Sequence, residues 1–335
     1  MENRITHVLI ESMVRKALKD ARESPERSVR NLIDVGLNFS TGKYQQHFLE
    51  VSRKLLENDD SGYYRLIRNA VRDADTETLV TFGMNVGYGS CTLGADLIRR
   101  TEEKEHFNIP WMLTLSVEQE NCQNHLRQCR SLIDQGTKLG IYTYAVFIRS
   151  LPPDIFSLFA EHQDCAFVLF CSSAEITDDF LEQAKMLHNL CISVEIDSHS
   201  PSVCHRLRRN RLIYGVHTFY TADTAPDILN GSFLDNTEDY APPLVFFIPS
   251  LSCPEDTRKK IYDYILECRQ SQEYPSVAID VFHDGLKVDA IISSDPNLIL
   301  FRTDGVVSTS RGQSYRLPGM DEPDLKTLLK ELLPK

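Results

Sequence analysis

From Pro110 onward, short apolar runs alternate with amphipathic segments, and this alternation limits the possible folds more than any other feature of the chain. Strand-like apolar runs lie at residues 111–117, 141–148, 166–170, 192–196, 212–219, 244–248 and 277–282. Apolar residues at helical spacing predict helices at residues 123–139, 154–162, 178–187 and 254–270. Such alternation is typical of βαβ units with a parallel sheet. It predicts an α/β fold with a partial or complete (β/α) barrel of the TIM type.

The chain before this region is helical in pattern, which predicts an all-α N-terminal domain over residues 1–105. Residues 29–38 and 76–85 share Leu, Gly and Asn at matching positions, and each stretch predicts a helix–Gly–Asn corner. The barrel domain is expected over residues 106–275. Asp284-Gly285 is typical of a turn. A small C-terminal extension over residues 276–335 is then expected to hold a hairpin at 298–308 and a last helix at 324–333.

Composition excludes several classes of partner. The net charge is −12 and the densest basic cluster, at residues 206–211, is short, so we expect no nucleic-acid binding. No stretch reaches the roughly 20 apolar residues of a membrane span, and Met1 to Lys19 lacks the apolar core of a signal peptide. We therefore expect no membrane association. The nine cysteines, irregularly spaced, are interpreted as reduced thiols of a cytoplasmic protein.

Five segments of the chain are similar in sequence to segments of one known family. They are Asn108-Ile-Pro-Trp111, Gly140-Ile-Tyr-Thr-Tyr144, Phe167-Val-Leu-Phe170, Ile176-Thr-Asp-Asp-Phe180 and Asp280-Val-Phe-His-Asp-Gly285. In order and spacing they resemble the radical S-adenosylmethionine (SAM) enzymes, in particular the group with a helical N-terminal and a cysteine-bearing C-terminal extension. The resemblance spans nearly the whole chain.

The resemblance implies a cluster loop, C-x-x-x-C-x-x-C, whose three thiolates hold a [4Fe–4S] cluster and leave one iron open for SAM. Here the matching stretch has Cys122 and Cys129 at the outer positions but Leu126, which cannot ligate iron, in the middle. The stretch also lies within a predicted helix, where the two cysteines share one face. We therefore expect a degenerate member of the superfamily without a bound cofactor. The alternative is a two-cysteine remnant completed by His125 or an external ligand.

Other positions that the resemblance marks as functional have changed too. The Gly-Gly-Glu that holds the amino group of SAM is replaced by a stretch around Arg149, and the Asn-Gly turn after the third strand by Cys171-Ser172-Ser173-Ala174. Two cysteines of the C-terminal extension are replaced by Ile291 and Ser310. Because residues have changed at several separate places, we interpret the whole cofactor site of the family as no longer maintained in this chain.

A polar strand end remains as a candidate ligand site. Ser193 and Glu195 resemble the motif that contacts the ribose of SAM, and their alternation on a strand places both side chains on one face. Asp197 follows them, and Arg149 ends another strand. His199, His217 and His283 also lie near predicted strand ends, where barrel enzymes place catalysis. The alternative is that these residues are ordinary polar strand ends and turns.

Three functions remain open. The first is a protein inactive in radical chemistry that binds a partner protein, such as an active homologue, or a small ligand. The second is an enzyme with new acid–base chemistry at the strand ends, using Glu195, Asp197, His199, Arg149 or His217. The third is a protein that keeps SAM or an iron–sulfur cluster in altered form.

Overall fold

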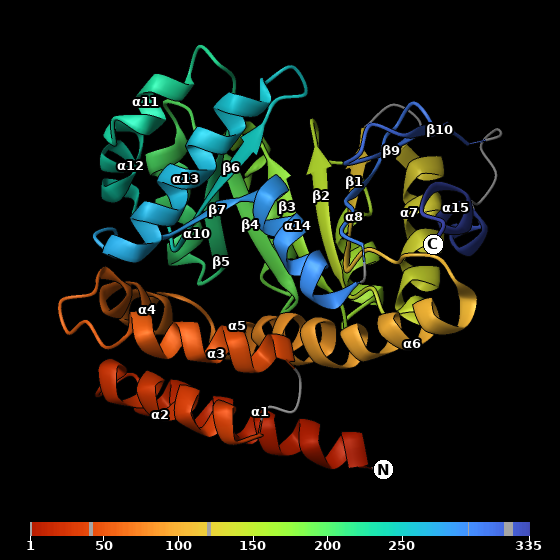
Figure 1. Ribbon diagram of the computed structural model, residues 1–335. Helices are drawn as coiled ribbons and strands as arrows, with labels where there is room; N and C mark the ends of the chain where they lie inside the picture. Colours follow the sequence, from red (N-terminus) through yellow and green to blue (C-terminus); the bar gives the residue numbers. More distant parts are fainter. Residues whose placement is uncertain (1, 40–42, 119–121, 294, 318–323) are drawn as a thin grey trace. The chain divides into compact units, whose positions relative to one another are not determined.

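The computed structural model describes residues 2–39, 43–118, 122–293, 295–317 and 324–335. The chain divides into two compact units, the first made of Met1–Val80 with Ser193–His283 and the second of Thr81–Ile192 with Asp284–Lys335. It passes from one unit to the other within α5 (Thr76–Met84), β4 (Leu190–Glu195) and α14 (Val281–Ile292) (Figure 1). The domain boundaries predicted after residues 105 and 275 stay predictions.

The second unit has a mostly parallel sheet with strand order β10-β9-β8-β1-β2-β3. β1 pairs in parallel with β2 and with β8, β2 pairs in parallel with β3, and β9 runs antiparallel to both β8 and β10. Its strands are β1 (Met112–Val117), β2 (Thr143–Ile148), β3 (Ala166–Cys171), β8 (Ile299–Phe301), β9 (Val306–Thr309) and β10 (Ser314–Arg316). Its helices are η1 (Asn85–Gly94), α6 (Ala95–Glu105), α7 (Cys122–Leu139), α8 (Ile155–Glu161), η2 (Ser173–Glu175), α9 (Asp178–Ala184) and α15 (Leu325–Leu332).

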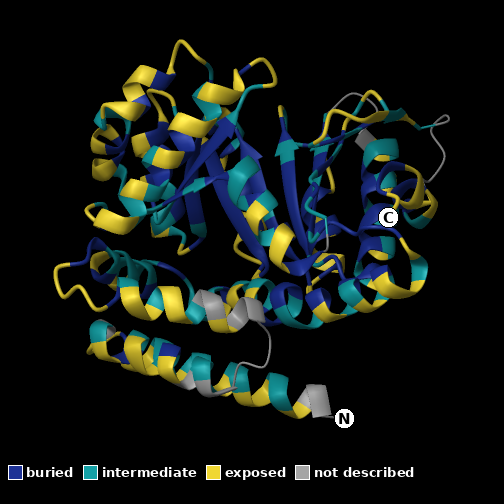
Figure 2. Ribbon diagram, in the orientation of Figure 1, coloured by how far each residue is buried: buried dark blue, intermediate teal, exposed yellow. Residues whose placement is uncertain are grey.

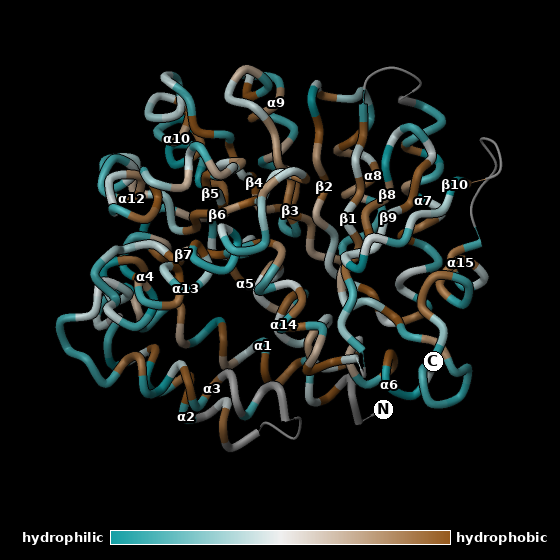
Figure 3. The backbone as a smooth tube through the Cα atoms, turned by 45° about the horizontal axis from the view of Figure 1, so that its top comes forward, coloured by the Kyte–Doolittle hydropathy of each residue, from teal (hydrophilic) through white to brown (hydrophobic). Residues whose placement is uncertain are grey.

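Strands β1, β2 and β3 of this unit are buried along most of their length, as Figure 2 shows. Leu113, Leu115 and Val117 of β1 have no exposed surface, and Tyr144 of β2 has none either. Continuous apolar runs are expected of parallel strands because helices cover both faces of the sheet. Figure 3 shows the contrast in hydropathy between apolar β2 and the charged helix α6.

The corner predicted around Gly83 and Asn85 is wrong, because the backbone stays helical from α5 through the π-helix η1 into α6. A Cβ on Gly94 would lie 2.3 Å from the backbone oxygen of Gly140, so this helix can approach the start of β2 only with glycine there. The π-helical turns end at this close backbone contact within the second unit.

The C-terminal part of the second unit is fixed to the start of β1 by Asp289. Its carboxylate is fully buried and accepts hydrogen bonds from the backbone N–H groups of Trp111, at 2.8 Å, and Asn297, at 2.7 Å. Burial raises the pKa of Asp289 to about 7 in spite of these two donors. The indole Nε1 of Trp111 also donates to the backbone oxygen of Gly285, at 3.0 Å.

The turn predicted at Asp284-Gly285 is wrong, because α14 runs through both residues. The carboxylate of Asp280 accepts a hydrogen bond from the backbone N–H of His283 at 2.6 Å and so caps the first turn of this helix. Gly285 lies against Leu298, whose nearest atom would be 3.1 Å from an added Cβ. The hairpin predicted at residues 298–308 is confirmed by β8 and β9.

The first unit combines a helical layer with three parallel strands in the order β5-β6-β7. Ile33 and Leu56 form a small buried cluster with Tyr64 of α4 in the helical layer. Its helices are α1 (Glu2–Asp20), α2 (Pro25–Phe39), α3 (Lys43–Leu55), α4 (Gly62–Asp73), α10 (Ser200–Arg209), α11 (Ala225–Leu229), α12 (Ser232–Thr237), η3 (Glu238–Tyr240) and α13 (Glu255–Ser271). Its strands are β5 (Ile213–Tyr220), β6 (Leu244–Pro249) and β7 (Val277–Asp280).

The expected fold class is confirmed: the protein is α/β, and its described residues form ten strands in mostly parallel pairing with helices between them, consistent with a partial or complete (β/α) barrel. No described helix combines the length and the apolar character that a membrane-spanning segment needs.

Candidate functional site

The stretch expected at the place of a cluster loop is helical. Helix α7 begins at Cys122 and includes Leu126 and Cys129, as the sequence predicts. Leu126 and Cys129 are each only 5% exposed, whereas the side chain of Cys122 lies outside the described part of the structure. Burial raises the pKa of the Cys129 thiol to about 12, so the thiol keeps its proton at neutral pH.

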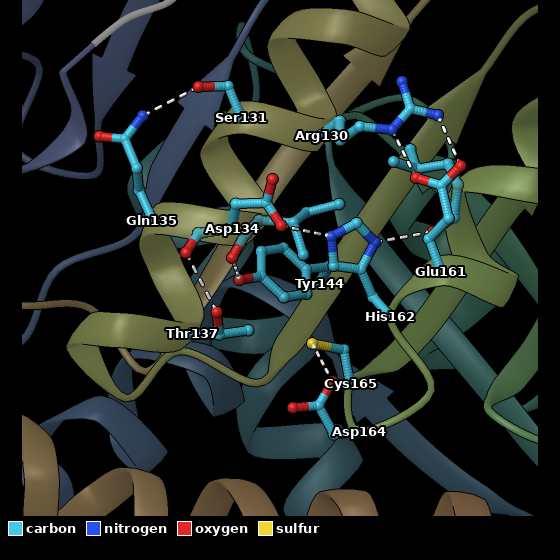
Figure 4. A network of polar contacts seen from close by, with 12 residues as sticks. Arg130, Ser131, Asp134, Gln135, Thr137, Tyr144, Glu161, His162, Asp164 and Cys165 are labelled. Carbon is cyan, nitrogen blue, oxygen red and sulfur yellow. Dashed lines mark hydrogen bonds and ion pairs between the residues drawn. The ribbon is translucent and has the colours of Figure 1, made fainter.

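Contacts with α8 and the residues that follow it hold α7 in place (Figure 4). Arg130 forms an ion pair with Glu161 of α8 through two hydrogen bonds. Asp134 contacts the buried ring of His162, with 3.0 Å between Oδ1 and Nε2, and the other ring nitrogen lies 2.8 Å from the backbone oxygen of Leu158. These contacts are made by residues 130 and 134, one to two turns beyond Leu126, so they anchor the middle of the helix.

The residues of α7 do not fit a cluster that needs three thiolates. The middle position is the aliphatic and buried Leu126, and the proton of Cys129 would have to be lost in an apolar environment. His125 directly precedes Leu126 on the helix, and its Nδ1 atom is buried with no hydrogen-bond partner among the described residues. In the part of the chain that the structure describes, no three His, Cys, Asp or Glu side chains are grouped so that they could hold a metal ion.

The predicted polar end of β4 separates into a buried and an exposed part. Ser193 is fully buried, and its Oγ lies 3.0 Å from Nδ1 of His217, which is 2% exposed. Burial lowers the pKa of His217 to about 3, so the imidazole is neutral at physiological pH. A serine–histidine pair without solvent access cannot reach a substrate, so this pair is part of the core of the first unit.

The other predicted residues at this end are exposed. Glu195 lies at the exposed end of β4. Asp197 accepts a hydrogen bond from the backbone N–H of His199 at 2.7 Å, and Ser200 Oγ donates to the same carboxylate oxygen at 3.2 Å. Asp197 therefore stabilises the turn into α10. In the structure Ser193 contacts His217 and not Glu195. The ligand-binding role of Ser193, Glu195 and Asp197 stays a prediction.

Arg149 follows β2 in the second unit with an 88% exposed side chain, and its Nε atom is 3.8 Å from Oε1 of Glu118. The sequence has no carboxylate in residues 148–151, at the end of β2. The structure supplies one from another segment, because Oε2 of Glu175 in η2 accepts a hydrogen bond from the backbone N–H of Leu151 at 2.7 Å. Glu175 was missed because it follows β3 in the sequence and reaches the end of β2 only in the fold.

The sequence prediction also missed a polar group at the carboxyl ends of β5 and β7. Tyr220, the last residue of β5, donates a hydrogen bond to Oδ2 of Asp280, the last residue of β7, at 2.9 Å. The other carboxylate oxygen of Asp280 lies 3.0 Å from Nδ1 of His283. Asp280 has no exposed surface, whereas the side chain of His283 is 25% exposed. The signal in the sequence was weak, because Tyr220 directly follows one predicted strand, at 212–219, and Asp280 lies inside another, at 277–282.

Comparison with solved structures gives similarity at low sequence identity. No protein-family model and no curated protein matches the chain. Among solved structures, SuiB from Streptococcus suis is similar with a TM-score of 0.48 and 10% identity, over 90% of this chain and 81% of that one. A structure of anSMEcpe with bound AdoMet and the Cp18Cys peptide has a TM-score of 0.41 and 12% identity, over 65% and 80% of the two chains. Likeness at this level assigns no activity to this chain.

Proposed function

We propose that this protein keeps a radical-SAM-like frame without radical chemistry and acts by binding a partner protein or a small ligand. One observation carries the proposal: the stretch from Cys122 to Cys129 is part of an anchored helix whose middle position is a buried leucine. Thiolates are the ligands of an iron–sulfur cluster. Leu126 has no ligand atom, and the raised pKa of the Cys129 thiol disfavours its thiolate.

A change of conformation would be costly. To expose Cys129, α7 would have to unwind over its first two turns and remove Leu126 and Cys129 from the core. Removing a buried leucine side chain from its packing costs about 2–5 kcal/mol. The cluster would have to offset this free energy with at most two of its three usual ligands.

The test is SAM cleavage by anaerobically reconstituted protein. The protein is incubated with iron and sulfide, reduced with dithionite, given SAM, and assayed for 5′-deoxyadenosine. The matched control is the double variant Cys122→Ser/Cys129→Ser. We expect no product above this control. Product formed by the wild type and abolished in the double variant would refute the proposal.

An exposed apolar strip on α1 supports binding of a protein partner, of which an active homologue is one. Ile5, Val8 and Leu9 lie at helical spacing on this helix and are 59%, 58% and 50% exposed. Adjacent large apolar side chains on a surface are typical of protein–protein contacts. The variant Val8→Glu is expected to weaken such a complex in a pull-down without changing the circular dichroism spectrum of the protein.

A second candidate function is a residual metal site on α7, and the buried, unpartnered Nδ1 atom of His125 favours it. His125 lies three residues after Cys122 and four before Cys129, so the three residues share one helix face. Metal content distinguishes the two functions. Iron or zinc that is retained by the wild type and lost in His125→Gln would favour the residual site.

A further inference from the structure

The parallel strands of the first unit bring several polar groups to one edge. In the register of β5, β6 and β7, Tyr220 is aligned with Pro249, and Phe247 with Asp280. Ser250 therefore follows β6 beside the end of β5, and its backbone N–H donates to the backbone oxygen of Tyr220 at 2.9 Å. The carboxyl ends of parallel strands are where α/β proteins bind ligands.

His283 is held in a defined orientation at this edge. Its Nδ1 atom faces the buried carboxylate of Asp280, and its ring stacks on Tyr262 with 4.7 Å between centroids and 17° between planes. A carboxylate at Nδ1 places the hydrogen of the neutral ring there and leaves Nε2 as an acceptor. No described residue bonds to Nε2, and the side chain is a quarter exposed.

Arg258 places a cation beside the same edge. It lies in the first turn of α13, which packs against β7, and its guanidinium carbon is 5.2 Å from the centre of the Phe282 ring. That ring also contacts the His283 ring, at 5.3 Å between centroids. Among the described residues no carboxylate pairs with Arg258, and its Nε atom is buried without a hydrogen-bond partner. Arg258 and His283 therefore flank one aromatic ring.

The charge and the hydrogen-bond donors of Arg258 beside His283 favour the binding of an anion. An unpaired guanidinium presents a planar fork of N–H donors that matches a carboxylate or phosphate. The negative charge of Asp280 is compensated because its oxygens accept from Tyr220 and from both the backbone and the ring of His283. The first turn of α13 also carries Glu255 and Asp256, which offset the partial positive charge of its N-terminus, so Arg258 is the group that would hold the anion.

We propose that this edge of the first unit binds a small molecule with a carboxylate or phosphate group, held by Arg258, with His283 Nε2 accepting a hydrogen bond from a hydroxyl of the same ligand. The inference rests on the proposed binding function and names its ligand class. Inorganic phosphate, in its hydrogen phosphate form, and malate each carry both an anionic oxygen and a hydroxyl. They serve as probes for the phosphate and the carboxylate sources.

The test is calorimetric titration of each probe into the full chain at constant ionic strength. We expect one saturable site for at least one probe, and at least tenfold weaker binding by Arg258→Gln. Lys259→Gln is the matched control, because Lys259 is the neighbouring exposed cation on the same helix and pairs with Asp263. Equal affinity in Arg258→Gln and wild type, or no saturable binding of either probe, would overturn the proposal.

A second readout uses the wild-type protein and needs no variant to fold. In ¹⁵N-histidine NMR spectra, the Nε2 resonance of His283 is expected to shift as the probe saturates the site. Saturable binding that leaves this resonance unchanged would overturn the assignment. Neither experiment contains iron or SAM, so the anion site and the proposed loss of radical chemistry can fail separately.

Discussion

The buried carboxyl group of Asp289 predicts how the stability of the second unit depends on pH. Burial raises its pKa from 3.8 to about 7 in the folded protein. Between these pH values the folded state binds a proton that the unfolded state has lost. The contribution to stability is therefore fully present below pH 3.8 and is lost as the pH rises toward 7.

The magnitude follows from the difference between the two pKa values. Each unit corresponds to 1.36 kcal/mol, so the full difference is about 4 kcal/mol. From pH 5 to pH 7.5 the wild type should lose about 2.5 kcal/mol relative to Asp289→Asn, which cannot titrate at this position. Other titrating groups are shared by the two proteins and cancel in this comparison.

The assay is urea unfolding of both proteins at the two pH values, followed by tryptophan fluorescence. The chain has one tryptophan, Trp111, and its backbone N–H donates to Asp289, so the signal reports on this part of the second unit. A free-energy difference between the two proteins that is the same at pH 5 and pH 7.5 would refute the assignment of a raised pKa to Asp289.

Three further changes test the packing. Gly94→Ala should destabilise the protein by several kcal/mol because its Cβ would meet a backbone oxygen. Its control, Gly87→Ala, meets nothing within 4 Å and should stay within about 1 kcal/mol of the wild type. Equal urea midpoints of the two variants would contradict this expectation. Leu126→Ala should cost about 3 kcal/mol in urea unfolding, and Leu251→Ala, at a 91% exposed position, should cost almost nothing. His162→Ala should cost about 1–3 kcal/mol by leaving polar atoms of α7 and α8 unpaired, and an unchanged thermal midpoint would contradict that role.

Much of the fold could be predicted from the sequence because apolar periodicity reports local structure directly. The strand-like run at 166–170 and the helical spacing at 123–139 correspond to β3 and α7 almost residue for residue. The glycine-based predictions failed at Gly83 and Gly285. Glycine is typical of turns, but here helices run through both positions. Gly285 packs closely against Leu298, a contact that is not visible in local sequence, whereas a Cβ on Gly83 would meet nothing within 4 Å.

The candidate site was less predictable for a related reason. The register of the strands brings its residues together, and this register cannot be derived from a single sequence. Tyr220 and Asp280 are 60 residues apart and share a hydrogen bond only because β5, β6 and β7 are aligned. Ser193 and His217 were both named from the sequence, but their complete burial could not be predicted from two alternating strands.

The most direct test of the central claim is the iron content of the full chain after anaerobic purification and reconstitution. A cluster enzyme of this type binds about four irons per chain in its first cluster. With Leu126 and Cys129 buried in α7, we predict less than one iron per chain and no absorption band typical of an iron–sulfur cluster. About four irons per chain, lost in Cys122→Ser/Cys129→Ser, would contradict the account.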